Sequence, residues 1–303
     1  MIGVAIALVA TFIAYRAWHP AQPGHSAAQR NGYALPVSPS SYIGLYAPKS
    51  NSQVKAFTAG TGIKPKLLVY YSGWPQSFRE GFATTAAREG AVPVVQINPT
   101  DISISAIANG KYDSYLNTYA MAVRAYHHPI ILSFGHEMNG YWYSWGNTHT
   151  SPATFVAAWR HIVTFFRKLS VRNVTWLWTV NTIHRHGRVP SPAPWWPGKS
   201  YVNWVGIDGY YTDSSSLFAS VFGPTIVAIR ALTHDPVLIA ETSATPASVQ
   251  PEKIANLFAG VHLYGLLGFV WFDSYSKVDW RIGSSAALAA FRQGAQTFFR
   301  LAS

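Results

Sequence analysis

The chain contains no cysteine, which excludes disulfide bonds, thiolate metal sites and a cysteine nucleophile. Any metal site would have to come from its 11 histidines and 12 acidic residues. Charged residues make up only 12% of the 303 residues, whereas hydrophobic residues make up 49%. This composition excludes intrinsic disorder and is sufficient for a large buried core.

Acidic residues are scarce relative to basic ones, so the formal net charge is +11, and aromatic residues reach 15%. A basic chain rich in Trp and Tyr suits stacking either on nucleic-acid bases or on sugar rings. The Lys and Arg residues form no run and match no nucleic-acid-binding motif, so we expect no nucleic-acid partner. We interpret the surplus charge as a scattered basic surface that associates with anionic envelope polymers.

Long apolar runs are missing except for Ile2–Tyr15. This run is shorter than the roughly 20 apolar residues of a transmembrane helix and suits the apolar core of a secretory signal. No basic residue precedes it, and Arg16 and Trp18 suit the edge of an uncleaved anchor equally well. We expect residues 1–18 to be a signal peptide or a signal anchor that tethers the chain to a membrane, and the protein to be secreted or at the cell surface. Residues 19–40 are rich in Pro, Ser, Ala and Gly and are predicted to be a flexible linker.

From Ser41 onward, short apolar runs alternate with helical stretches. The runs lack period-2 polarity, which is typical of parallel strands buried on both faces; they are Tyr42–Ala47, Lys66–Ser72, Val92–Asn98, Pro129–Glu137, Val174–Asn181, Val202–Tyr210, Pro236–Glu241 and Gly268–Asp273. The predicted helices are Gln76–Glu89, Ser105–Ala125, Pro152–Leu169, Ser216–Leu232, Gln250–Leu263 and Ser285–Leu301. Eight such units predict a single α/β domain over residues 41–303, a (β/α)8 (TIM) barrel, which we expect to be a monomer. A doubly wound open sheet is the main alternative, but no phosphate-binding glycine fingerprint follows the first strand.

Polar residues end several of these apolar strands, namely Ser72, Asn98, His136, Glu137, Asn181, Asp208, Glu241 and Asp273. In a barrel these strand ends share one rim, where such enzymes place their sites. Two carboxylates at that rim are the equipment of glycoside hydrolysis, in which one protonates the leaving oxygen and the other attacks the anomeric carbon. The alternative is that each carboxylate only hydrogen-bonds a neighbouring loop.

Seven of the 12 tryptophans fall in predicted loops after strands, namely Trp74, Trp142, Trp145, Trp195, Trp196, Trp271 and Trp280. Aromatic faces bind the apolar faces of pyranose rings, so this placement favours a groove lined for sugars.

Four segments resemble glycoside hydrolase family 26: Phe134–Gly146 (FGHEMNGYWYSWG), Trp204–Tyr211 (WVGIDGYY), Leu238–Ser243 (LIAETS), and Val270–Asp273 with Asp279–Ile282. The resemblance implies a (β/α)8 barrel and a retaining mechanism without a cofactor. It assigns Glu137 as the general acid/base and Glu241 as the nucleophile, which retention places about 5–5.5 Å apart.

The resemblance implies further roles at the site. Trp142 would form a wall at the cleaved bond, Tyr210 would hydrogen-bond the nucleophile, and Trp271 would be an aromatic platform. His136, which precedes the acid/base, would orient a carboxylate or bind a sugar hydroxyl. The remaining candidates for substrate contact are Trp74, Trp145, Asn181 and Asp208.

The family includes β-1,4-mannanases, mixed-linkage β-glucanases and β-1,3-xylanases. We expect an endo-acting enzyme whose first candidate substrate is β-1,4-mannan, followed by mixed-linkage β-glucan. A barrel that only binds carbohydrate and a basic nucleic-acid-binding module are the other classes considered.

The histidines give weaker signals. His136 and Glu137 resemble part of a zinc-protease helix, but Gly140 stands where the second histidine is needed. His184 and His186, with His127 and His128, suit solvated loops better than a metal site, and we expect no metal. Arg185 and Arg188, in the predicted loop after the strand Val174–Asn181, are candidates for lining the sugar-binding groove.

Overall fold

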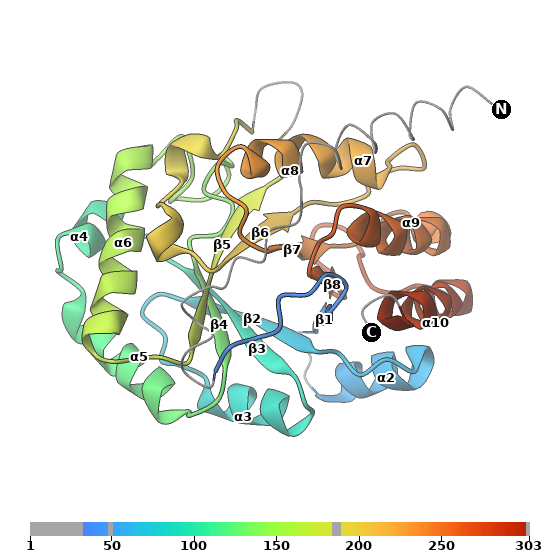
Figure 1. Ribbon diagram of the computed structural model, residues 1–303, viewed down its shortest axis with the longest axis horizontal. Helices are drawn as coiled ribbons and strands as arrows, with labels where there is room; N and C mark the ends of the chain where they lie inside the picture. Colours follow the sequence, from blue (N-terminus) through green and yellow to red (C-terminus); the bar gives the residue numbers. More distant parts are fainter. Residues whose placement is uncertain (1–32, 48–50, 184–188, 301–303) are drawn as a thin grey trace.

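The computed structural model describes residues 33–47, 51–183 and 189–300. Eight parallel strands pair in chain order, and the last pairs with the first, so the sheet is a closed barrel (Figure 1). The strands are β1 Tyr42–Tyr46, β2 Leu67–Gly73, β3 Val92–Asn98, β4 Ile130–Phe134, β5 Val174–Asn181, β6 Trp204–Asp208, β7 Val237–Thr242 and β8 Gly268–Phe272. The predicted barrel is therefore confirmed.

Helices surround the strands (Figure 1). They are α2 Asn51–Thr61, α3 Glu80–Arg88, α4 Ile104–Ala108, α5 Asp113–Ala125, α6 Pro152–Lys168, α7 Phe218–Val221, α8 Gly223–Arg230, α9 Gln250–Leu263 and α10 Ser285–Arg300. Helix α2 was not predicted. Two predicted helices are each split in two. Ser105–Ala125 is interrupted around Gly110, whose φ of +76° lies in the left-handed region. Ser216–Leu232 is interrupted where Gly223 and Pro224 follow Phe222. Between β5 and β6 the described chain forms two 3-10 turns, η2 Ala193–Trp195 and η3 Lys199–Tyr201.

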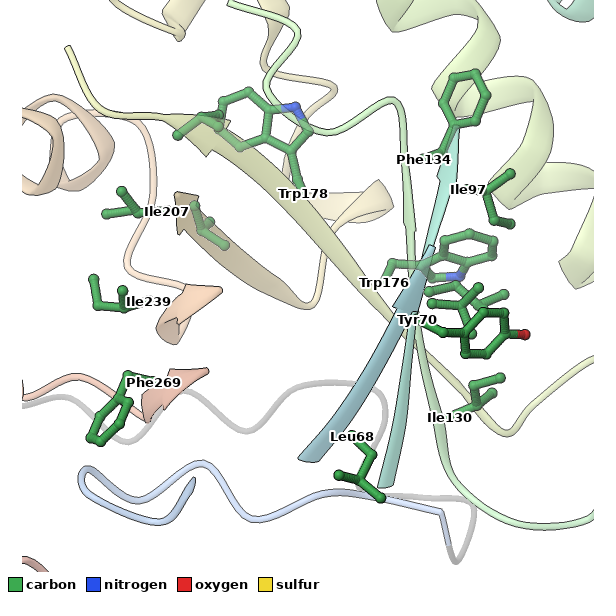
Figure 2. Close-up of a cluster of buried hydrophobic side chains, with 14 of the residues drawn as sticks. Leu68, Tyr70, Ile97, Ile130, Phe134, Trp176, Trp178, Ile207, Ile239 and Phe269 are labelled. Atoms are coloured by element: carbon green, nitrogen blue, oxygen red, sulfur yellow. The ribbon is translucent and has the colours of Figure 1, made fainter. Parts of the chain in front are cut away.

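Alternation along the strands produces two apolar layers. The inner layer fills the barrel with Tyr42, Leu67, Val94, Ile131, Leu177, Leu238 and Val270. The outer layer packs the strands against the helices, and Figure 2 shows members of it on strands β2 to β8, among them Tyr70, Phe134, Trp176, Trp178 and Phe269.

Helix α6 illustrates how the shell holds the loops. The Ser151 side chain accepts a hydrogen bond from the Thr154 backbone N–H at 3.2 Å, and Pro152 occupies the first turn, as predicted. One face of the helix buries Phe155, Trp159, Ile162 and Phe166. Burying one such side chain contributes about 1.5–3 kcal/mol. The helix therefore fixes the downstream end of the loop that follows β4.

Part of the predicted linker lies against the barrel. Leu35 packs on the inner layer, the Tyr42 hydroxyl donates to the Pro36 carbonyl at 2.8 Å, and the Ser40 N–H donates to the Leu266 carbonyl at 2.9 Å. The chain thus enters at the end where strands begin, which we call the base; the opposite end is the mouth. Residues 1–32, including the predicted signal or anchor, lie outside the described residues. Among the helices that are described, none combines the length and hydropathy needed to cross a bilayer.

Candidate active site

The backbone after β4 is bent to present Glu137 at the mouth. Gly135 and Glu137 both have φ of +55°, and the Glu137 N–H donates to the Thr179 carbonyl at 3.0 Å. A left-handed conformation at a non-glycine residue costs on the order of 1–3 kcal/mol and is concentrated at functional sites. The loop stores this strain where the predicted acid/base is located.

Two N–H donors hold the Glu137 carboxyl group. Asn181 Nδ2 donates to Oε1 at 2.6 Å, and Trp142 Nε1 donates to Oε2 at 2.8 Å. The residue is only 6% exposed. Burial raises the pKa of Glu137, and the two donors partly oppose this effect.

A one-residue irregularity in β7 orients Glu241. Ile207 pairs with Ile239, but the next residue of β6, Asp208, pairs with Glu241, so Ala240 is an extra residue. Such bulges bend a strand and re-aim its side chains, often beside active sites. Here the bulge places Glu241 within reach of side chains from β2 and from the loop after β6.

Two phenol hydroxyls hold the Glu241 carboxylate: Tyr210 donates to Oε1 and Tyr71 donates to Oε2. Burial raises the pKa of Glu241 to about 8, whereas hydrogen bonds donated to a carboxylate favour its ionised form. Around this carboxylate lies an aromatic collar of Tyr46, Tyr71, Tyr210, Phe272 and Trp280. Tyr46 stacks on Phe272 at 4.7 Å, and Trp280 lies 4.4 Å from Tyr210 between ring centroids.

Asp208 lies between the two carboxylate sites. In the strand register it pairs with Asn181, which binds Glu137, and with Glu241. It is fully buried, and within the described residues neither of its carboxylate oxygens has a hydrogen-bond partner. Burial, followed by the charge of Glu137, raises the pKa of Asp208 well above its ordinary value. The group therefore favours its neutral form.

His136 supports the loop from below the mouth. Its Nε2 lies 3.2 Å from the Tyr143 hydroxyl, and the Tyr143 ring stacks on Trp145 at 4.3 Å. Trp145 Nε1 in turn donates to the His136 carbonyl at 2.8 Å. Burial lowers the pKa of His136 to about 3, so the imidazole is neutral near pH 7.

Exposed rings flank Glu137. Trp142 and Tyr141 are 41% and 43% exposed, and their centroids are 5.1 Å apart. The Trp142 ring crosses directly over Gly140, where an added Cβ would lie 2.5 Å from a ring carbon. Gly140 is thus required for the position of Trp142.

Four predicted substrate contacts are contradicted. Trp74, Trp145 and Trp271 have no face open to a sugar, and both carboxylate oxygens of Asp208 are buried. Trp271 is fully buried and packs on Phe291 of α10 at 5.2 Å. Trp74, 7% exposed, lies against Tyr115 at 4.5 Å, and Trp145 is stacked beneath Tyr143. Trp271 belongs to the outer layer of β8, so its neighbour Phe272 faces the mouth instead.

Sequence reasoning missed Tyr71 and did not select Trp280 or Phe272 as site residues. It treated Ser72 as the rim residue of β2, but Ser72 is buried and faces Tyr119 of α5. In the structure Leu67, Val69 and Tyr71 share the inner face of β2. Leu68 and Tyr70 make the outer face equally apolar, so the sequence carries no signal that selects Tyr71.

A cavity of about 380 Å³ adjoins the collar, lined by Thr245, Pro246, Ala247, Asp279, Arg281, Ile282 and Gly283. Trp280 of the collar lies between two of its lining residues in the sequence, and the Trp280 carbonyl accepts a hydrogen bond from the Ser243 hydroxyl at 2.8 Å.

The part of the chain that the structure describes contains no group of three His, Asp or Glu residues placed to hold a metal ion. His184, Arg185, His186 and Arg188 lie outside it.

Comparison with known families and proteins gives consistent matches. The sequence model of glycosyl hydrolase family 26 matches residues 65–247. Endoglucanase H from Acetivibrio thermocellus is 31% identical over 261 residues, which is 80% of this chain and 29% of that protein. A mannan endo-1,4-beta-mannosidase from Bifidobacterium adolescentis is 26% identical over 147 residues, or 45% of this chain and 15% of that protein. The chain therefore spans less than a third of the length of these curated relatives.

Solved structures share the barrel. GH26C from a Muricauda species superposes with a TM-score of 0.70 at 14% identity and covers 86% of each chain. A modular endo-beta-1,4-mannanase from Cellulomonas fimi superposes with a TM-score of 0.66 at 16% identity, covering 84% of this chain and 70% of the other. At identities this low, these superpositions show that the proteins share a fold.

Proposed function

Because the chain belongs to glycosyl hydrolase family 26, we propose that it is a retaining endo-glycoside hydrolase that cleaves a β-linked polysaccharide. The observation that carries this proposal is the pair of carboxylates at the mouth in contrasting environments. Glu137 is held by two N–H donors, and Glu241 by two phenol hydroxyls. No cofactor takes part in the proposed reaction.

In the first step, a carboxylate oxygen of Glu241 attacks the anomeric carbon while Glu137 gives its proton to the departing glycosidic oxygen. This leaves a glycosyl group covalently bound to Glu241. In the second step, Glu137 takes a proton from water, the water oxygen attacks the same carbon, and Glu241 is released. Two displacements on one carbon retain its configuration.

The environments supply the protonation states that these steps need. Burial raises the pKa of Glu137, which favours the proton that it donates. The hydroxyls of Tyr71 and Tyr210 favour the ionised form of Glu241 against the effect of burial. The neutral His136 adds no positive charge that would lower the pKa of Glu137.

The first candidate substrate is β-1,4-mannan, which is supported by the mannosidase and mannanase relatives. Mixed-linkage β-glucan is the second candidate, because the relative that matches over 80% of this chain is an endoglucanase. Exposed Tyr141 and Trp142 on one side of the site and Trp280 on the other supply faces for stacking on sugar rings.

Two alanine variants and a matched control test the roles. Glu241→Ala should abolish turnover of every substrate. Glu137→Ala should lose activity on polysaccharides but keep most of it on aryl glycosides with activated leaving groups, which need no proton. The control Glu89→Ala, at an exposed glutamate beyond the end of α3, should match the wild type. Equal and mild losses in both site variants would contradict the assignment.

The substrate is tested separately by digesting purified β-mannan, mixed-linkage β-glucan and β-1,3-xylan and identifying the products. NMR of the first-formed anomer reports retention. Product from none of the three, with intact binding to one of them, would favour a barrel that only binds carbohydrate.

We also propose that the enzyme acts outside the cytoplasm, because residues 1–18 have the composition of a signal or anchor and polysaccharides do not cross membranes. Fractionation of cells that express the full chain tests this: activity confined to the cytoplasm would overturn it.

A further inference from the structure

Basic side chains gather at the base of the barrel. In this topology the C-terminal turns of helices and the segments that lead into strands lie at the end opposite the mouth. These positions hold Lys64, Lys66, Arg88, Arg124, Arg167, Lys168, Arg172, Lys199 and Arg230, which we call the basic base. All of them are exposed except Arg230, which is half-buried.

Carboxylates are concentrated at the opposite end. The described residues include all 12 acidic residues, and among these Glu89 and Asp235 lie at the base. The others follow strands or begin helices toward the mouth, as Asp101, Asp213 and Asp279 do. Lys and Arg residues also occur elsewhere, for example Arg79, Lys111 and Lys277, but few carboxylates accompany those at the base. The net positive charge is therefore concentrated at the base of the barrel.

Two arginines of the base are held in place by backbone carbonyls, which leave their positive charge intact. Arg167 donates to the Ser200 carbonyl at 2.7 Å, and Arg124 to the Leu169 carbonyl at 3.3 Å. The ion pairs found in the described part of the chain, His161–Asp113, Lys253–Glu252 and Arg281–Asp279, all lie elsewhere. Lys199 and Arg230 interact with the charge of Asp235, but the exposed Lys and Arg side chains on the rest of the base remain available to an anionic partner.

The N-terminal part of the chain joins the barrel at this same end. Leu35 and Ser40 contact the base, and the apolar run Ile2–Tyr15 precedes them in the sequence. Residues 16–32 span at most about 60 Å when fully extended, at roughly 3.3–3.6 Å per residue. Whatever surface receives the apolar run therefore lies within reach of the basic base.

We propose that the basic base docks on an anionic phospholipid bilayer that receives the apolar run, so that the mouth faces away from the membrane. The apolar run is short for a stable anchor, and a short apolar anchor combined with a basic patch binds anionic membranes far better than either alone. The proposal concerns a face remote from the mouth and does not depend on the substrate or on the catalytic roles.

Vesicle binding of the full chain tests the charge requirement. The base variant combines Lys66→Gln, Arg88→Gln, Lys168→Gln and Arg172→Gln. The matched control removes the same charge elsewhere through Arg79→Gln, Lys111→Gln, Lys277→Gln and Arg292→Gln, all at exposed positions. Each is sedimented with vesicles of phosphatidylcholine alone or with phosphatidylglycerol, at low and high salt.

We expect the base variant to bind phosphatidylglycerol vesicles at least about tenfold more weakly than the wild type, because it lacks four positive charges that face the anionic surface. The control should stay within about twofold of the wild type, and all three chains should bind phosphatidylcholine equally. Equal weakening of both variants would overturn the proposal, because net charge alone would then explain binding. Tighter binding of a soluble polyanion such as polyglutamate than of the vesicles would also overturn it.

Orientation is tested by a single label, since the natural chain has no cysteine to interfere. A fluorophore on Glu89→Cys at the base should be quenched by nitroxide lipids in phosphatidylglycerol vesicles, and one on Ser214→Cys in the loop after β6 should not. Equal quenching of the two labels would refute the orientation. Unchanged turnover of a soluble aryl glycoside by the base variant shows that membrane docking and catalysis are separate.

Discussion

Removing the Tyr71 hydroxyl offers a sharp test of how the nucleophile is kept charged. Tyr71→Phe deletes the donor to Glu241 Oε2 but keeps the ring, which packs edge-on against Tyr46 at 5.0 Å. A hydrogen bond to a charged group contributes about 1.5–3 kcal/mol, and 1.36 kcal/mol corresponds to one pKa unit. The pKa of Glu241 should therefore rise by about 1–2 units.

The sign follows from which form the hydroxyl stabilises. Tyr71 favours ionised Glu241, so without it the carboxyl group binds its proton more tightly and the active form is lost at a higher pH. The acid limb of the kcat/KM profile should move toward alkaline pH by about one unit or more, while activity on the plateau falls less. Tyr210→Phe should shift the limb in the same direction, because it removes the donor to Oε1.

The assay is the pH profile for an aryl glycoside with an activated leaving group, which minimises the contribution of Glu137. Tyr126→Phe is the matched control, because its hydroxyl donates to the Ala83 carbonyl at 2.8 Å, away from the mouth. An unchanged acid limb, with activity reduced equally at every pH, would refute the reasoning and leave Tyr71 as a packing residue.

Gly140→Ala should displace the Trp142 ring and break its bond to Glu137, lowering kcat at least tenfold at nearly unchanged melting temperature; full activity would contradict this. Asp208→Asn should become more stable relative to the wild type as pH rises from about 4. The buried Asp208 carboxyl, whose pKa is raised, resists ionisation in the folded wild type, whereas the same group ionises freely in the unfolded chain. Melting curves of both proteins at pH 5 and 8 measure the difference in stability, and a difference that does not change with pH would contradict the prediction. Trp271→Phe should lower the melting temperature with KM unchanged, whereas Trp280→Ala should raise KM severalfold; the reverse pattern would restore Trp271 as a sugar platform.

The strands could be predicted because burial on both faces leaves a continuous apolar signature. Val92–Asn98 and Val174–Asn181 have the same bounds in the sequence and in the structure. Helix α2, Asn51–Thr61, was missed because its sequence, NSQVKAFTAGT, has little apolar periodicity and no acidic first turn. Its position depends on packing against the barrel instead of on local preference.

The site could be predicted only in part. The glutamates stand out because a buried strand gives a carboxylate no structural role, and family resemblance located Tyr210 beside Glu241. The face to which a strand side chain points was harder to predict, because Trp271 in the outer layer and Phe272 at the mouth are consecutive residues. Tyr71 was missed for the same reason: nothing in the local sequence states which face of β2 turns inward.

Because Ala240 is an extra residue in β7, the direction of the Glu241 side chain depends on the number of residues in the strand as well as on their type. Ile239 is matched to Phe269 and Thr242 to Trp271 across the neighbouring strand. A descendant that lost Ala240 would still close its barrel, but the carboxylate would be turned out of phase with Tyr71 and Tyr210. Among homologues that retain the glutamate, the number of residues between the positions of Ile239 and Thr242 would then distinguish hydrolases from inactive proteins that only bind sugar.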